Sequence, residues 1–169
     1  MSNEDFAEDF SATHIECLKK SIEVSFNFIS DNSLKFTGEN TNSVLWMSEG
    51  IVGIISLVGD LSWSVSLGLP KQSAINMAKL FAGFDIAYDS DDMDDVTGEL
   101  INVLAGDIVA QLDAVGTSVD MSLPTVARGN QMEVHVPDRL PRIQLHYTSN
   151  EGDFAISLTS GKFHDRRNK

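Results

Sequence analysis

The chain has 169 residues, of which 42% are apolar and 8% aromatic, so it is long enough to fold as one domain with a substantial core. Its formal charge of −13 argues against nucleic acid as a partner, because such a surface repels a phosphate backbone. The single cysteine, Cys17, excludes an intrachain disulfide and a CxxC metal or redox site.

Neither a targeting signal nor a membrane span is evident. The first ten residues are acidic and lack the apolar stretch of a signal peptide, and the longest apolar run, 51–58, is too short to cross a bilayer. We therefore expect a cytoplasmic protein with residues 1–169 in one domain. Residues 162–169 form a basic tail, which either docks on the acidic body or is a solvated end.

The first expected element is a helix that follows Ser11, a residue type that favours the N-cap position. Its apolar residues recur at helical spacing, and they are Ile15, Leu18, Ile22, Phe26 and Ile29. Cys17 is expected in the buried part of this helix. A short segment at 34–36 follows within a polar region and is typical of an edge strand.

The next part of the chain predicts strands. Residues 43–47 and 51–58 are expected to form two of them, and the second is apolar on both faces, as in a central strand. Gly59-Asp60 favours a tight turn into a third strand at 61–67. Ser62, Ser64 and Ser66 alternate with apolar residues there, so we expect them on the solvated face rather than as nucleophiles, since no G-x-S-x-G motif surrounds them.

A second helix is expected over residues 70–81, with Pro70 in its first turn and Gly83 as its stop signal. The C-terminal part predicts strands at 118–123, 131–136, 142–148 and 153–159, with Pro124 as a breaker and a turn at 128–130. The overall order of elements favours an α+β fold, an antiparallel sheet with helices packed on one face.

His135 and His146 lie in consecutive predicted strands and are candidates for cross-strand neighbours. Two histidines without a carboxylate or thiol at ligand spacing do not define a zinc site. The acidic run 89–95 fails the EF-hand pattern, because it lacks the glycine and the terminal glutamate of that loop. Acids at a helix start are explained by the helix dipole. No metal site is expected.

The most informative segment is the helix predicted over 91–114. Leu100, Leu104, Ile108, Leu112 and Val115, together with Ile101, form its expected buried face. A second line of the same helix contains mainly acids and one amide: Asp91, Asp95, Glu99, Asn102, Gly106 and Asp113. Gly98 and Gly106 each cost about 1 kcal/mol relative to alanine within a helix. They indicate either packing against a neighbouring strand or the close approach of a partner.

The spaced set Asp95, Glu99, Asn102 and, downstream, Pro124 resembles the signature of the CheC/CheX chemotaxis phosphatases. Segments 98–106 and 123–129 are also similar to that family's helix and following strand. CheC-like members have the E-x-x-N motif twice, whereas the predicted helices of this chain carry it once, because Glu16 and Glu23 in the first helix lack an amide three residues later. The resemblance is therefore to the CheX-like branch.

The resemblance implies a homodimer that hydrolyses the phosphoaspartate of a CheY-type receiver domain. Asn102 would orient the attacking water, and Glu99 would pair with the lysine of the receiver. Asp95, Gly98, Gly106 and Pro124 would support the motif and the partner surface. The receiver would supply Mg²⁺, so the chain needs no cofactor of its own.

A different class of function shares the same fold. The chain would then be a non-catalytic module that docks a receiver or a flagellar-switch component. The intact pair of Glu99 and Asn102 favours the enzyme, because docking alone has no evident need for the amide.

Overall fold

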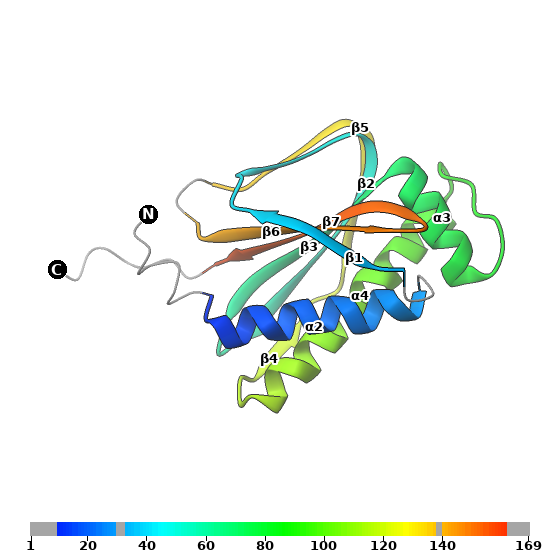
Figure 1. The fold of residues 1–169 in the computed structure, drawn as a ribbon. Coiled ribbons are helices and arrows are strands. Elements are labelled where there is room, and N and C mark those ends of the chain that lie inside the picture. Colours follow the sequence, from blue (N-terminus) through cyan, green and yellow to red (C-terminus); the bar gives the residue numbers. More distant parts are fainter. Residues whose placement is uncertain (1–9, 30–32, 138–139, 162–169) are drawn as a thin grey trace.

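One antiparallel sheet organises the molecule (Figure 1). The structure is a computed structural model that describes residues 10–29, 33–137 and 140–161, so the basic tail at 162–169 lies outside the described residues. In chain order the described elements are α2 (Ala12–Ile29), β1 (Lys35–Asn40), β2 (Val44–Gly59), β3 (Ser62–Pro70), α3 (Lys71–Ala82), α4 (Asp91–Ala114), β4 (Val119–Met121), β5 (Thr125–His135), β6 (Arg142–Ser149) and β7 (Gly152–Ser160).

The strands are ordered β1-β6-β7-β3-β2-β4, and β5 also pairs with β2. The described helices α2, α3 and α4 cover one face of this sheet (Figure 1). The predicted α+β architecture is therefore confirmed. β1 lies at an edge of the sheet, where its only partner strand is β6, as the composition of that segment predicts.

Helix α2 begins as its sequence predicts. The side-chain oxygen of Ser11 accepts a hydrogen bond from the backbone N–H of His14 at 3.2 Å, which satisfies one free donor of the first turn. Leu18, Ile22 and Phe26 are fully buried and Cys17 is 7% exposed, so the predicted apolar stripe is packed at these positions. Ile15 is half-buried, and the side chain of Ile29 is not among those that the structure describes.

Strand β2 corrects two predictions. The expected separate strands at 43–47 and 51–58 are one continuous strand, and the expected turn at 128–130 lies inside β5. Gly50 pairs with Gly129 across the two strands. A Cβ atom at Gly50 would lie 2.7 Å from the carbonyl oxygen of Leu69 and 2.8 Å from the sulfur of Met47. Only glycine therefore fits at this position, where the paired strands β2 and β5 bend. Gln131, with a φ of 49°, belongs to the same bend.

The tight turn between β2 and β3 is confirmed, since Val58 pairs with Ser62 across it. Ser62 and Ser64 are half-buried, but Ser66 is only 8% exposed. The prediction of a solvated face is therefore wrong for Ser66. It pairs with Ser157 of β7, which is itself only 5% exposed, so this part of the sheet is buried.

The two candidate histidines are not neighbours. His135 pairs with Val44 of β2, and its Nε2–H donates a hydrogen bond to the carboxylate of Glu133 at 2.8 Å, whereas His146 pairs with Ala155 of β7. The prediction fails because β5 folds back along β2 instead of pairing with β6.

Helix α4 lies against the centre of the sheet. A Cβ atom at Gly53 of β2 would lie 3.1 Å from Ile101, so this glycine lets the helix approach the strand closely. Leu100, Leu104, Ile108 and Leu112 are buried as expected, but Val115 is 47% exposed because the helix ends at Ala114. The predicted stop at Gly116 is confirmed by its φ of 81°.

Candidate active site

The outer face of α4 is the candidate site. Asp95 and Glu99 are exposed there, and Asn102 and Gly106 are half-buried, so all four lie on the side of the helix that points away from the sheet. We call these four residues the polar line. The spacing of four, three and four residues, which predicted a common face, is confirmed by this pattern of exposure.

Glu99 and Asn102 combine a rigid backbone with side chains that are available for a ligand. Between them lie Leu100 and Ile101, which are 1% and 0% exposed and hold this turn on the core. Residues three apart on a helix have Cβ atoms about 5–6 Å from each other. Within the described part of the chain, neither side chain makes a hydrogen bond or ion pair. The turn thus presents one carboxylate and one amide to the outside.

Gly98 and Pro124 are in contact in the fold. A Cβ atom at Gly98 would lie 3.7 Å from Cγ of Pro124 and 3.8 Å from Val126. These are ordinary packing distances, so the strand segment rests on the helix at this glycine. The packing explanation thus applies to Gly98, and Pro124 helps to position the turn that precedes Asn102.

Gly106 has a different environment. Among the described residues, a Cβ atom added there would meet no packing neighbour within 4 Å outside the helix's own nearby backbone and the adjacent residues. Packing within the chain therefore does not require glycine at this position, and the helix backbone is open to an approaching molecule.

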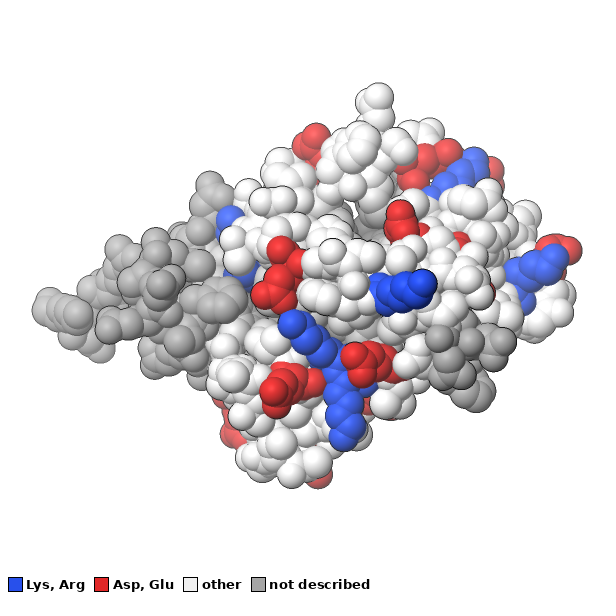
Figure 2. Space-filling model, viewed as in Figure 1, with Lys and Arg blue, Asp and Glu red and all other residues white. Residues whose placement is uncertain are grey.

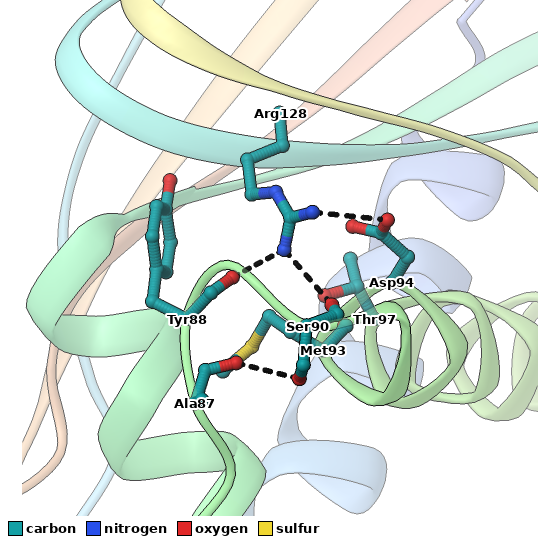
Figure 3. A network of polar contacts seen from close by, with 7 residues as sticks. All are labelled: Ala87, Tyr88, Ser90, Met93, Asp94, Thr97 and Arg128. Atoms are coloured by element: carbon teal, nitrogen blue, oxygen red, sulfur yellow. Dashed lines mark hydrogen bonds and ion pairs between the residues drawn. The ribbon is translucent and has the colours of Figure 1, made fainter.

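Arg128 of β5 fixes the start of α4 (Figure 3). Its guanidinium donates hydrogen bonds to the carbonyl oxygens of Tyr88 and Ser90, the latter at 3.0 Å. It also forms an ion pair with Asp94 at 3.4 Å. Sequence analysis missed this residue, because the predicted turn at 128–130 placed it outside a strand and nothing local shows which helix it faces.

Tyr88 completes this cluster from the loop before α4. Its ring lies 4.9 Å from Nζ of Lys71 and 5.7 Å from the guanidinium carbon of Arg128, distances typical of cation–π contacts. Burial is the main cause that raises the pKa of the Tyr88 hydroxyl above its usual value. The phenol therefore stays neutral beside the two cations.

Helix α4 is strongly acidic. Its sequence contains seven acidic residues and no Lys or Arg. By contrast, Figure 2 shows acidic and basic side chains interspersed on the face viewed there. On α2 and β1, Lys19 and Glu39 form an ion pair at 2.9 Å. Only Asp94, among the acids of α4, has an ion-pair partner within the described ranges. The polar line is therefore suited to a cationic ligand group.

The described residues contain neither a metal cluster nor a membrane-spanning helix. Across residues 10–29, 33–137 and 140–161, no group of three or more His, Cys, Asp or Glu residues is arranged to hold a metal ion. None of the described helices combines the length and the apolar character that crossing a membrane requires.

Solved structures share this fold. A chemotaxis protein CheX from Desulfovibrio desulfuricans has a TM-score of 0.78 and 20% identity, covering 87% of this chain and 98% of that one. A CheC-like superfamily protein from Shewanella sp. PV-4 has a TM-score of 0.80 and 18% identity, with coverages of 90% and 100%. The CheX–CheY–BeF₃–Mg²⁺ complex from Borrelia burgdorferi gives 0.72 and 16%, with coverages of 87% and 96%.

Sequence comparison gives the family. No curated protein matched the chain in a direct comparison. The family model described as chemotaxis phosphatase CheX matches residues 51–148, which is more than half of the chain and includes all of α4 and Pro124. The chain belongs to the CheX family of chemotaxis phosphatases.

Proposed function

We propose that this chain hydrolyses the phosphoaspartate of a CheY-type receiver, with Asn102 orienting the attacking water and Glu99 aligning the receiver. The main support is the pair itself: a carboxylate and an amide one turn apart, on the outward face of a helix that is fixed to the sheet. The fold is shared with a CheX that was solved in complex with CheY, BeF₃ and Mg²⁺, which supports the choice of substrate.

Asn102 acts on the attacking water. Its side-chain oxygen accepts a hydrogen bond from that water and holds it in line with phosphorus. The water oxygen forms a bond to phosphorus while the bond to the aspartyl oxygen breaks, which releases inorganic phosphate and restores the carboxylate of the receiver. An amide suits this task because it does not compete as a nucleophile.

Glu99 aligns the receiver. Its carboxylate pairs with the lysine beside the phosphoaspartate, and this charged hydrogen bond fixes the position of the phosphoryl group over Asn102. The Mg²⁺ belongs to the receiver and neutralises the phosphoryl oxygens, so the chain supplies no metal ligand. Asp95, one turn before Glu99, adds negative charge to the same face.

Decay of a phosphorylated receiver tests the chemistry. We expect wild-type protein to accelerate decay in the presence of Mg²⁺ and Asn102→Ala to lose at least about a hundredfold of that acceleration, equivalent to about 2.7 kcal/mol. Binding of the receiver should change by only a few fold. Asn130→Ala is the matched control, because Asn130 is exposed on β5 and away from the polar line. An equal loss in both variants would contradict the role of Asn102.

Glu99→Ala tests the alignment. We expect weaker binding together with slower turnover, because the variant lacks the charge pair. Asp113→Ala is the control, since Asp113 is an exposed acid about 21 Å further along the same helix. An unchanged affinity for Glu99→Ala would remove the lysine contact from the proposal.

The non-catalytic alternative and the oligomeric state are tested by separate measurements. Binding of a receiver without faster decay would identify the non-catalytic docking module. We also propose a homodimer, on the basis of family membership, and light scattering that gives a monomer would contradict it.

A further inference from the structure

Exposed apolar residues flank the polar line on both sides. On the strand side, Leu123 is 88% exposed and Met121 is 46% exposed. On the α2 side, Val103 is 41% exposed and Val24 is 51% exposed. We call these pairs the two apolar shoulders. Single exposed leucines are common on protein surfaces. Four exposed apolar residues on the two sides of one polar line are less common and indicate a contact surface.

The strand-side shoulder lies next to the turn that carries Glu99. Segment 121–128 runs antiparallel to α4, since Arg128 contacts Asp94 and Pro124 packs at Gly98. Leu123 directly precedes Pro124, and Glu99 directly follows Gly98. The contact between Pro124 and Gly98 therefore brings Leu123 close to the turn that begins at Glu99.

The opposite shoulder is aligned in the same way. α2 packs beside α4 with the opposite chain direction (Figure 1), because Ser25 donates to Asp107 at 2.5 Å while Cys17 contacts the carbonyl oxygen of Gln111. Val24 adjoins Ser25, and Val103 is one turn before Asp107. The polar line thus runs between apolar side chains of α2 and α4 on one side and of β4 and the segment after it on the other.

We propose that Leu123 is the apolar anchor for the phosphorylated receiver and determines its affinity rather than the rate of the chemical step. This inference rests on the proposed function. The acidic polar line complements the lysine and Mg²⁺ of a receiver, which makes the receiver the occupant that fits this surface. Solvent-exposed charge pairs contribute little to affinity, whereas apolar groups around them exclude water and strengthen them.

Leu123→Ser tests the anchor, and Leu80→Ser is its matched control. Leu80 is also an exposed leucine, at 47%, but it lies on α3 and not beside the polar line. The probe is a CheY-type receiver loaded with beryllofluoride and Mg²⁺. We expect Leu123→Ser to weaken binding about tenfold, or about 1.4 kcal/mol, and Leu80→Ser to leave binding unchanged. The dephosphorylation rate at saturating protein should stay at the wild-type value for both.

Other results would overturn the inference and separate it from the proposed function. If Leu123→Ser binds normally while Asn102→Ala loses turnover, the anchor is wrong and the phosphatase stands. If Leu123→Ser lowers the saturating rate, Leu123 acts in chemistry and not as an anchor. A changed oligomeric mass with unchanged receiver affinity would assign the shoulder to contact between copies of this chain. A wild-type chain that binds no receiver contradicts both proposals.

Discussion

Replacing Arg128 tests how the fold stabilises the start of α4, the helix that carries Glu99 and Asn102. Arg128→Met keeps an unbranched apolar stem but removes the donors to Tyr88 and Ser90 and the partner of Asp94. A hydrogen bond from a charged donor contributes about 1.5–3 kcal/mol, and the partial exposure of this cluster reduces that value. The ion pair adds less than about 1 kcal/mol, because Asp94 is 39% exposed. We expect a total loss of about 2–4 kcal/mol.

Arg142→Met is the matched control for this prediction. Arg142 also binds backbone carbonyl oxygens, namely those of Thr41 at 3.0 Å and of Pro137 and Leu140 at 3.3 Å, but at the other end of the sheet. Urea unfolding gives the loss of stability in both variants. Hydrogen exchange then locates it: the amides of residues 95–98 should exchange about tenfold faster in Arg128→Met than in wild type, an opening free energy lower by about 1.4 kcal/mol. They should be unchanged in Arg142→Met.

The reasoning is refuted if exchange at 95–98 is the same in both arginine variants. Binding of the receiver provides a second readout, since a frayed first turn displaces Glu99, the proposed receiver contact, relative to the core. Arg128→Met should therefore lose receiver affinity beyond what its lower stability explains, and Arg142→Met should not.

Two further predictions concern Gly106 and Tyr147. Gly106→Ala should raise the free energy of unfolding by about 1 kcal/mol, because alanine favours the helix and meets no neighbouring atom; an unchanged urea midpoint would contradict this, and weaker receiver binding by the same variant would support close approach of the partner. Burial, with Glu23 and Glu39 nearby, raises the pKa of Tyr147 well above its usual range. Above about pH 10 the unfolded chain loses the hydroxyl proton of Tyr147, whereas the native state keeps it. The stability that this proton contributes is therefore complete below about pH 10 and declines above it. Tyr147→Phe should lose less stability than wild type between about pH 9 and pH 11, and equal losses would contradict the assignment.

The local rules of sequence predicted much of the fold. The N-cap at Ser11, the stop at Gly83 and the turn at Gly59-Asp60 depend on residues close together in the chain, and all three are present. The common outer face of the polar line follows from helix periodicity alone. These features need no knowledge of what packs where.

The wrong predictions arise where distant segments decide the structure. Residues 128–130 have the composition of a turn, but they bend within β5 because Gly129 faces Gly50 of β2. The histidine pair failed for the same reason, since chain order does not determine which strands pair. Arg128 could not be assigned because its partners belong to a loop and a helix about forty residues earlier in the chain.

The position of β7 has a consequence for how this protein folds during synthesis. β7 is the last described strand, yet it lies between β6 and β3 and pairs Ser160 with Trp63. Such long-range pairing delays folding, because β3 must wait for a segment that leaves the ribosome much later. A nascent chain can therefore contain the complete E-x-x-N motif while the sheet beneath α4 is still incomplete. The motif is local, but the sheet that supports its helix is complete only when the last described strand is in place.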